Sequence, residues 1–470
     1  MTTVDFTSFL EPKSVAIVGA SRSPGKPGYL VISNLKANEY PGKIYPVNPQ
    51  AQEIMGYKAY PSVADLPEVP DVAIILVPAS ATIEAVRDCV RKGIKAAVIE
   101  SGGYTEVNER GAKLERELLQ SAEKGRMRII GPNTSGVIST PGRFVTTFYP
   151  LGKVRRGSVA YLAQTGNFAT HTMRWILSAE NFGVSRVVGL GNKCDVDDAD
   201  VVEYFGADPD TRVICMYIEG FKDGKRFVEA ARQVSREKPV IALVGGVTAS
   251  GSKAVVSHTA SLGASNPALI EGVLRQAGVV SIHRYTDLID SAKALAFQPL
   301  PAGGRVGVIV PSGGMGVLAA DTCVRLGLTL AELSQSTLKK LQDVSQPWIR
   351  IGNPVDIWSA IQNHSLEEGY RVAMEALLGD PGIDSLVAIL VLTTDNPPPN
   401  LDFIPRFREK YPGKPVLIGV SGDKASFDLA KKTLESQSVP VYLPVEGACE
   451  ALATMYRCSL SMQRGKHTRD

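Results

Sequence analysis

Three times along this chain of 470 residues, a short apolar run ends in a glycine-rich turn and leads into a stretch of helical character. The three runs with their turns are Ser14–Gly19, Gly157–Gly166 and Gly304–Gly313. Further apolar runs of strand length alternate with helical stretches, as when Val72–Val77 is followed by Ala81–Lys92. Such alternation is typical of βαβ units around a parallel sheet. The pattern therefore predicts an α/β protein with parallel sheets.

The second and third modules carry the same landmarks in the same order. The pairs are Gly191-Asn192 with Gly352-Asn353, Asp208-Pro209 with Asp380-Pro381, and Lys238-Pro239 with Lys414-Pro415. We infer an ancestral duplication from this repeated order. The third copy has Thr393 where the second has Glu219, and it ends in Ser421–Lys424 without a histidine segment. We therefore expect catalytic residues only in the second copy.

The length predicts three domains, since globular modules commonly hold about 100–200 residues. A linker rich in proline and glycine, Gln298–Gly304, precedes the third module. We place the domains at residues 1–132, 133–297 and 298–470.

Composition excludes several classes of protein. Hydrophobic residues make up 44% of the chain and charged residues 21%, which is typical of soluble globular proteins. A net charge of +3, with no stripe of lysine and arginine, argues against nucleic-acid binding. No apolar run reaches the roughly 20 residues of a membrane helix, and we find no signal peptide. The six cysteines form no CxxC pair, so we expect free thiols in the cytoplasm.

His258 is the strongest candidate for a chemically active side chain. It lies in a segment of small and hydroxyl-bearing residues, Gly251–Ala264, which we expect to form a loop after the apolar run Pro239–Val244. An imidazole there can present a nitrogen while neighbouring amides and hydroxyls hold an anion. The segment therefore suits a phosphoryl carrier, although a lone histidine is also common as a surface or core residue.

Two of the glycine turns are candidate anion sites. In Gly19–Gly25 and Ala163–Phe168 a strand is followed by a helix start, where unpaired amides and the positive end of the helix dipole face a ligand. Each charge–dipole contact is worth about 0.3–1 kcal/mol when exposed. The first turn does not match the dinucleotide pattern GxGxxG, and tight packing also explains it. For the second turn the alternative is a simple helix cap.

Glu219 follows the predicted strand Val213–Ile218 and is a candidate partner for His258. A carboxylate there can accept a hydrogen bond from one imidazole nitrogen, fix the tautomer and make the other nitrogen a better nucleophile. The alternative role is a solvated charge at a strand end.

Four acidic residues and four further histidines raise the question of a metal. The aspartates cluster at positions 195, 197, 198 and 200, where helix capping explains them as well as a metal does. His171, His283, His364 and His467 lack the spacing of metal ligands. We predict no metal site.

The His258 segment, the Glu219 strand and the order of the modules resemble the alpha subunits of ADP-forming (NDP-forming) acyl-CoA synthetases, in the succinyl-CoA synthetase alpha-like superfamily. The resemblance covers almost the whole chain. It implies a Rossmann-like CoA-binding domain followed by two flavodoxin-like domains, the last a non-catalytic duplicate. It also implies that acyl-CoA, phosphate and ADP are converted reversibly to a carboxylic acid, coenzyme A and ATP, through an acyl phosphate and a phosphohistidine at His258.

The resemblance also implies the binding residues. Those expected to bind coenzyme A are Gly19, Ala20, Ser21, Arg22, Ser23, Pro24, Lys26, Val47, Asn48, Pro78, Glu100, Ser101, Gly102 and Asn133, and those expected to bind phosphate are Gln164, Thr165, Gly166 and Asn167. The chain departs from the family in two places. Gln50 stands where relatives often have lysine, and Ala163 and Thr165 stand where they usually have serines.

No segment resembles an ATP-grasp module, so the resemblance implies a separate beta subunit that supplies ADP or ATP and magnesium in a hetero-oligomer. Two alternatives belong to other classes. One is a catalytically inactive regulatory module that senses coenzyme A or acyl-CoA. The other is a nicotinamide-dependent dehydrogenase, although no acidic residue is well placed to hold a ribose. The sequence does not identify the acid substrate.

Overall fold

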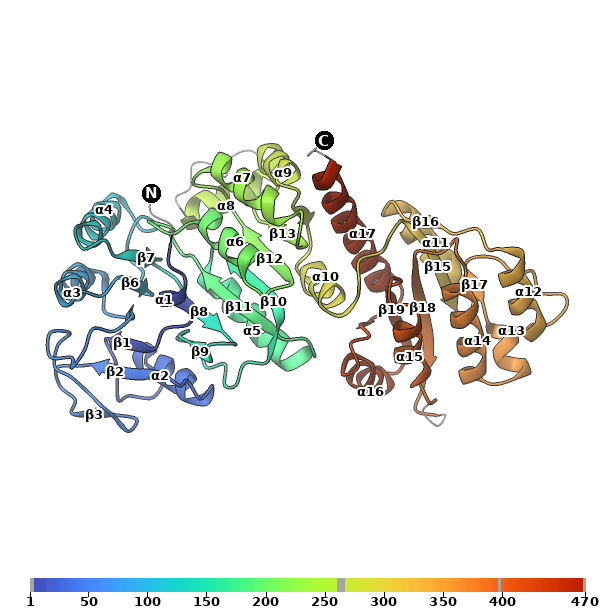
Figure 1. The fold of residues 1–470 in the computed structure, drawn as a ribbon, viewed down its shortest axis with the longest axis horizontal. Helices are drawn as coiled ribbons and strands as arrows, with labels where there is room; N and C mark the ends of the chain where they lie inside the picture. Colours follow the sequence, from blue (N-terminus) through green and yellow to red (C-terminus); the bar gives the residue numbers. More distant parts are fainter. Residues whose placement is uncertain (1–3, 260–266, 396–398, 468–470) are drawn as a thin grey trace. The chain divides into compact units, whose positions relative to one another are not determined.

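A computed structural model of the chain describes residues 4–259, 267–395 and 399–467. The chain divides into two compact units, residues 1–282 and 283–470 (Figure 1). The first unit contains two sheets and the second unit contains one.

The first sheet consists of five parallel strands in the order β2-β1-β5-β6-β7. The strands are β1 (Ser14–Val18), β2 (Lys43–Val47), β5 (Val72–Ile75), β6 (Ala96–Ile99) and β7 (Arg128–Ile130), and a short hairpin of β3 (Glu53–Ile54) and β4 (Tyr57–Lys58) lies outside the sheet. The associated helices are α1 (Thr7–Leu10), α2 (Pro27–Ala37), α3 (Ala79–Lys92) and α4 (Glu109–Lys124), of which α3 and α4 pack side by side. The strand order reverses between β1 and β5, and open α/β sheets bind ligands at such a point. The Gly19 turn follows β1 there.

The second sheet has seven strands in the order β14-β13-β12-β10-β11-β8-β9. Five are parallel, namely β10 (Arg156–Ala163), β11 (Val184–Gly189), β12 (Val213–Ile218), β13 (Val240–Val244) and β14 (Val280–Ile282), while β8 (Val137–Ser139) and β9 (Phe144–Val145) extend the β11 edge in antiparallel fashion. The helices are α5 (Gly166–Ala179), α6 (Asp198–Ala207), α7 (Gly224–Val234), α8 (Ala249–Thr259) and α9 (Pro267–Gln276). Here the order reverses between β10 and β12, where Gln164 and Glu219 follow their strands.

The two sheets of the first unit share one buried cluster of apolar side chains. Val31 of α2, Phe144 of β9 and Leu162 of β10 belong to it, and each is fully buried. The buried side chain of Asn34 adds polar links, since its Nδ2 donates to the carbonyls of Thr147 and Tyr149 at 2.7 Å. The two sheets of the first unit are thus packed through one continuous apolar core.

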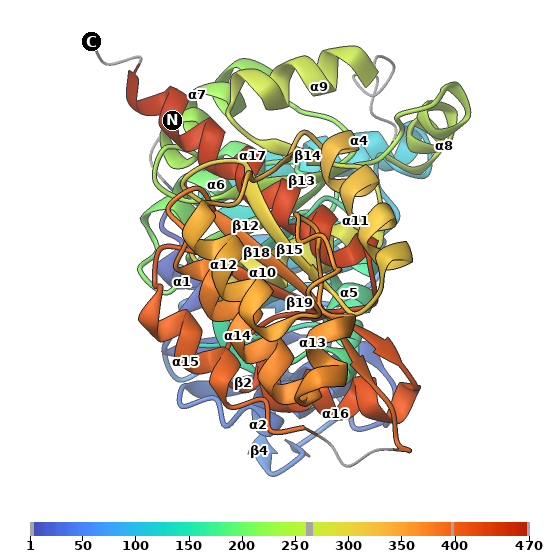
Figure 2. The ribbon, with the colours of Figure 1, turned by 90° about the vertical axis from the view of Figure 1, so that its right-hand side faces the viewer.

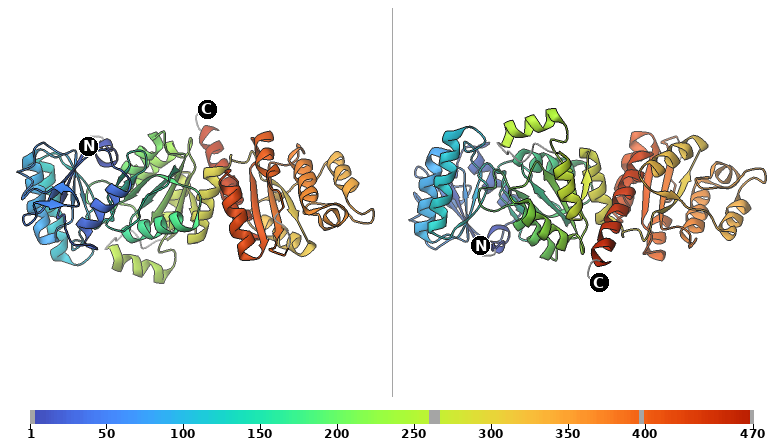
Figure 3. Two further views of the ribbon diagram at one scale, coloured as in Figure 1. Left: turned by 90° about the horizontal axis from the view of Figure 1, so that it is seen from below. Right: turned by 90° about the horizontal axis from the view of Figure 1, so that it is seen from above.

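The sheet of the second unit is parallel, in the order β16-β15-β18-β19-β20, with β17 also paired to β15. Its strands are β15 (Arg305–Val310), β16 (Thr329–Leu330), β17 (Val355–Asp356), β18 (Ser385–Leu392), β19 (Val416–Gly422) and β20 (Val441–Tyr442). Its helices are α10 (Tyr285–Phe297), α11 (Gly313–Arg325), α12 (Gln335–Val344), α13 (Trp358–Asn363), α14 (Leu366–Leu378), α15 (Phe403–Lys410), α16 (Lys424–Glu435) and α17 (Glu446–His467). Helices α10, α11 and α17 pack together on one side of the sheet, and α12, α13 and α14 pack together on the other (Figures 2 and 3).

These sheets confirm the predicted α/β class. The parallel strands of all three sheets follow the order 2-1-3-4-5 in chain sequence, with β17 of the third sheet off this path, so strand order alone does not distinguish a duplication of the second module, which stays a prediction. Helix α10 falls before the predicted boundary at residue 298, yet it packs against α17 in the second unit because its apolar face is buried there. None of the helices in the described ranges combines the length and the apolar character that a membrane span needs.

Candidate active site at two sheet edges

The side chain of Gln164 joins the carboxyl ends of β10 and β12. Its Oε1 accepts hydrogen bonds from the main-chain N–H groups of Glu219 at 2.7 Å and Gly220 at 3.2 Å. Its Nε2 donates to Asp198 Oδ1 at 2.8 Å and to the carbonyl of Gly220 at 2.7 Å. These four bonds use the full capacity of an amide side chain. Gln164 therefore positions the main chain at Glu219 and Gly220. Both hydrogens of its side-chain amide are already donated, so none is free to bind a phosphate.

We expect Gln164→Glu to destabilise the first unit. The new carboxylate cannot donate, so it faces Asp198 and the Gly220 carbonyl without the two hydrogen bonds that now hold them. Each buried polar group left without its partner costs about 1–3 kcal/mol, so the two groups together predict a loss of about 2–6 kcal/mol in the free energy of unfolding. Denaturant titration measures this loss. The same substitution at the exposed Gln120 is the control, and equal midpoints for the two variants would contradict the expectation.

A small cavity of about 100 Å³ brings together residues expected in two different roles. Glu100 and Asn133 come from the residues expected to bind coenzyme A, and Gln164, Thr165 and Gly166 come from those expected to bind phosphate. The remaining lining residues, which the sequence analysis did not select, are Thr134, Ser135, Phe148, Gly191 and Asn192. The cavity thus lies where the two sheet edges of the first unit meet.

Helix α5 begins at this cavity. Its first residue, Gly166, lies so close to the preceding segment that an added Cβ would be 2.7 Å from the main-chain nitrogen of Ser135. Thr165 is the N-cap, its hydroxyl makes no capping hydrogen bond, and the residue lines the cavity. Asn167 is part of α5, and its side chain lies outside the described part of the structure. A helix start with a hydroxyl beside it is suited to an anion.

Glu100, which follows β6, contributes a carboxyl group to the same cavity. The side chain is only 6% exposed, and within the described residues neither of its oxygens has a hydrogen-bond partner. Burial raises the pKa of Glu100 well above its ordinary value of 4.5, because water no longer stabilises the charged form. Gly136, at φ +86°, makes room for this group, since a Cβ there would lie 2.6 Å from Oε1. Burial therefore favours the uncharged form of Glu100.

The remaining residues expected to bind coenzyme A follow strands of the first sheet. Gly19 has φ +93°, and a Cβ there would lie 3.2 Å from the main chain of Leu76, so the turn closes tightly over β5. Asn48 fixes the turn by donating from Nδ2 to the carbonyl of Ala20 at 2.7 Å. Ser21 lies at the start of the turn and is half-buried, Val47 is buried in β2, Pro78 caps α3, and Ser101 and Gly102 follow Glu100. Arg22, Ser23, Pro24 and Lys26 are exposed.

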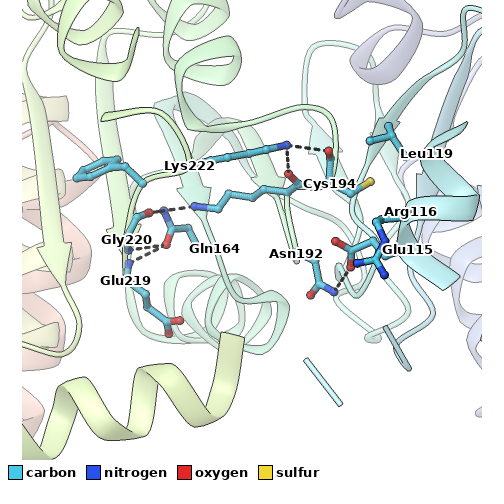
Figure 4. Close-up of a pocket in the computed structure, with 12 residues that line it drawn as sticks. Glu115, Arg116, Leu119, Gln164, Asn192, Cys194, Glu219, Gly220 and Lys222 are labelled. Carbon is cyan, nitrogen blue, oxygen red and sulfur yellow. Dashed lines mark hydrogen bonds between the residues drawn. The ribbon is translucent and has the colours of Figure 1, made fainter. Parts of the chain in front are cut away.

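A second cavity of about 280 Å³ lies between α4 and the loops that follow β11 and β12 (Figure 4). Lys193 donates from Nζ to Asp198 Oδ2 at 2.9 Å, and Lys222 donates from Nζ to the carbonyls of Lys193 and Cys194 at 3.1 and 2.8 Å. On the α4 side, Nδ2 of Asn192 donates to the carboxylates of Glu106 and Glu115. These lysines and glutamates were not among the site residues predicted from the sequence. The only available signal was the landmark Gly191-Asn192, which precedes Lys193.

Glu219 lines this cavity and is 4% exposed. Its Oε1 accepts a hydrogen bond from the hydroxyl of Tyr217 at 2.9 Å, while its carboxylate is directed away from Lys222 (Figure 4). Burial, reinforced by the nearby Glu219 charge, raises the pKa of Tyr217, so the phenol stays a donor. Tyr217 in turn stacks on Phe168 of α5, with ring centroids 4.2 Å apart. This packing holds the Glu219 carboxylate at the end of β12.

His258 falls in α8, so the expectation of a loop is wrong for residues 251–259. Small residues permit a helix here, and local bonds close its first turn: Thr248 Oγ1 accepts from the N–H of Gly251, and Ser252 Oγ donates to the carbonyl of Gly246. The side chain of His258 and all of residues 260–266 lie outside the described part of the structure. A contact between His258 and Glu219 therefore remains a prediction.

The aspartates after Lys193 have structural partners. Asp197 is the N-cap of α6 and forms a capping box with Asp200, as expected for acidic residues at a helix start. Asp195 forms an ion pair with Arg128, with a nitrogen–oxygen distance of 2.9 Å, and Asp198 binds Gln164 and Lys193. The capping interpretation is confirmed for Asp197 and Asp200, whereas Asp195 and Asp198 have side-chain partners instead.

Family models match three parts of the chain in order. They are described as a CoA binding domain (residues 13–140), a succinyl-CoA ligase like flavodoxin domain (156–295) and a Ligase-CoA domain (306–464).

Full-length comparisons agree with these matches. The chain is 40% identical over 451 residues to acetate–CoA ligase [ADP-forming] II of Archaeoglobus fulgidus, covering 95% of this chain but only 66% of that protein. It is 39% identical over 439 residues to the alpha subunit of acetate–CoA ligase [ADP-forming] II of Pyrococcus furiosus, covering 92% and 93%. A solved structure of dinucleotide forming acetyl-coenzyme A synthetase 1 of Ca. Korarchaeum cryptofilum, in complex with phosphate and ADP, covers 99% of both chains with a TM-score of 0.91 and 32% identity.

Proposed function

Because the chain belongs to the family of ADP-forming acyl-CoA synthetases, we propose that it converts acyl-CoA, phosphate and ADP reversibly to a carboxylic acid, coenzyme A and ATP. The observation that carries the proposal is the cavity at which Glu100 and Asn133 of the coenzyme A half meet the start of α5. A thioester and a phosphate bound at these two edges would meet there. The relatives are named as ligases, and nothing in them supports the alternative of an inactive sensing module.

The proposed reaction has two chemical stages. A phosphate oxygen at the start of α5 attacks the thioester carbonyl, the carbon–sulfur bond breaks, and acyl phosphate and coenzyme A form. A nitrogen of His258 then attacks phosphorus, and the acyl–oxygen group leaves as the carboxylate. Glu219 orients the imidazole and stabilises its charged form. The buried position of Glu219 at the switch point supports this role, because ligands of open sheets bind there.

A separate subunit completes the reaction in this proposal. The chain spans 66% of the length of the Archaeoglobus relative but 93% of the Pyrococcus alpha subunit, so the function is divided between chains in some relatives. We assign the nucleotide and magnesium to an ATP-grasp-type beta subunit that receives the phosphoryl group from His258. The resulting hetero-oligomer would work in the cytoplasm, where the six free cysteines remain reduced.

The substrate in this proposal is a small carboxylic acid such as acetate. Two sequence relatives, 40% and 39% identical to this chain, are named for acetate.

The test is incubation of the full chain with a panel of acyl-CoA thioesters and labelled phosphate. We expect coenzyme A to be released only when phosphate is present, fastest from acetyl-CoA, and an acid-labile label to remain on the protein. Thiol titration and acid and base treatment of the labelled protein measure the two outcomes. If no thioester in the panel releases coenzyme A in a phosphate-dependent manner, the proposed function is wrong.

A further inference from the structure

The buried carboxyl group of Glu100, in the first unit, has no hydrogen-bond partner that would offset the cost of its burial. Burying a carboxyl group without a hydrogen bond is costly, and most buried polar side chains are paired. Only 6% of the surface of Glu100 is exposed. In the described part of the chain, neither of its carboxyl oxygens has a hydrogen-bond partner. Packing alone would favour an apolar residue after β6. An unpaired carboxyl group in a cavity is therefore a candidate for contact with a ligand.

The position of Glu100 indicates which part of a ligand it would meet. It follows β6 in the sheet that carries the Gly19 turn, and across the cavity it faces Thr165 and Gly166 at the start of α5. In the proposed reaction these two sides hold coenzyme A and phosphate. The bond between sulfur and the acyl carbon is where the two substrates react, so it must lie between the two sides.

Glu100 is the side chain at this cavity that could transfer a proton. Among the described residues that line the cavity, Glu100 is the only ionisable one. The charged groups packed nearby are already engaged: Glu106 and Glu115 accept from Asn192, and Asp198 accepts from Gln164. Burial alone raises the pKa of Glu100 well above 4.5, which favours the protonated form that a general acid needs.

We propose that Glu100 is the proton donor to the sulfur of coenzyme A when the thioester is cleaved, and the proton acceptor from the thiol in the reverse direction. In cleavage, phosphate oxygen forms a bond to the acyl carbon, the carbon–sulfur bond breaks, and the proton moves from the carboxyl oxygen to the departing sulfur. Glu100 is left as a carboxylate and regains a proton from the acyl phosphate or from water. This inference rests on the proposed function and adds a catalytic residue to it.

The test compares three variants of the full chain with the wild type. Acetyl-CoA and phosphate are supplied without nucleotide, and hydroxylamine traps acetyl phosphate as acetyl hydroxamate. We expect Glu100→Gln to lower the rate by about 100-fold or more, a typical contribution of general acid catalysis. Glu123→Gln, at an exposed site on α4, should keep the wild-type rate.

The pH profile separates proton transfer from a structural role. For the wild type, the rate of thioester cleavage should fall as pH rises through the raised pKa of Glu100, because the donor form disappears. Glu100→Gln should lack this step, whereas Glu100→Asp, which keeps an ionisable group, should retain the step at a lower rate. If the wild type is active and Glu100→Gln shows the same rate and the same pH step, the role of Glu100 is wrong while the proposed function stands. An inactive wild type would overturn the proposed function, and the inference with it.

Discussion

A His258→Asn variant is expected to cleave acyl-CoA with phosphate but to carry no phosphoryl group and to support no ATP synthesis. Asparagine has no nitrogen lone pair comparable to that of imidazole, so the second stage has no nucleophile, while the first stage uses only the cavity and the start of α5. Loss of a nucleophile lowers turnover by at least about 10³-fold. The measurements are acid-labile label from labelled phosphate and hydroxamate formation from acetyl-CoA, recorded on the same samples.

The control for this prediction is His364→Asn, which makes the same change at an exposed histidine of the second unit. That variant should be labelled like the wild type. The amount of label on Glu219→Gln should lie between the amounts on His258→Asn and His364→Asn. This substitution keeps the shape of the side chain but removes the charge that would stabilise a positive imidazole. Label that persists in His258→Asn would exclude this residue as the carrier, and loss of hydroxamate formation would show that the two stages are not separable.

Much of the fold could be predicted because glycine turns and β-branched runs act locally. The run Ser14–Val18 forms β1, and Gly19 adopts φ +93° as a tight turn after a strand requires. The repeated order of the second and third modules could be read because the landmarks Gly191-Asn192 and Gly352-Asn353 recur in the same place in the sequence order. The loop prediction failed for residues 251–259 because small residues are compatible with both loop and helix, and the hydrogen bond from the N–H of Gly251 to Thr248 Oγ1 closes the first turn of α8.

The site could be predicted only in part, because its residues come together from strands far apart in sequence. Gln164 was selected for an anion, but its side chain is fully used by Glu219, Gly220 and Asp198, and no sequence pattern gives those partners. The lack of a partner for Glu100 is likewise a property of packing across two sheets. The sequence therefore indicates which residues follow the carboxyl ends of the strands. Which of these residues bind a ligand and which position the main chain depends on tertiary contacts.

Gly191→Ala is expected to damage both the stability of the first unit and its activity. Gly191 has φ +60°, and a Cβ there would lie 2.1 Å from the carbonyl oxygen of Pro132 and 2.6 Å from that of Asn133. The left-handed conformation costs an alanine about 1–2 kcal/mol, and overpacking adds about 1–3 kcal/mol. The loop after β11 or the segment at Asn133 must move apart. Because both line the small cavity, a shift of about 1 Å there should lower phosphate-dependent release of coenzyme A by about 100-fold.

Gly152→Ala separates the two causes, because Gly152 has nearly the same backbone conformation, φ +66°, but no atom within 4 Å of its added Cβ. This variant carries the conformational cost without the clash, so it should lose about 1–2 kcal/mol and keep its activity. Denaturant titration gives the difference in stability, and hydroxamate formation from acetyl-CoA gives the activity. If the two variants behave alike, close contact between the two sheet edges does not control the cavity. If Gly191→Ala alone loses activity, the junction of the edges is the element that aligns thioester and phosphate.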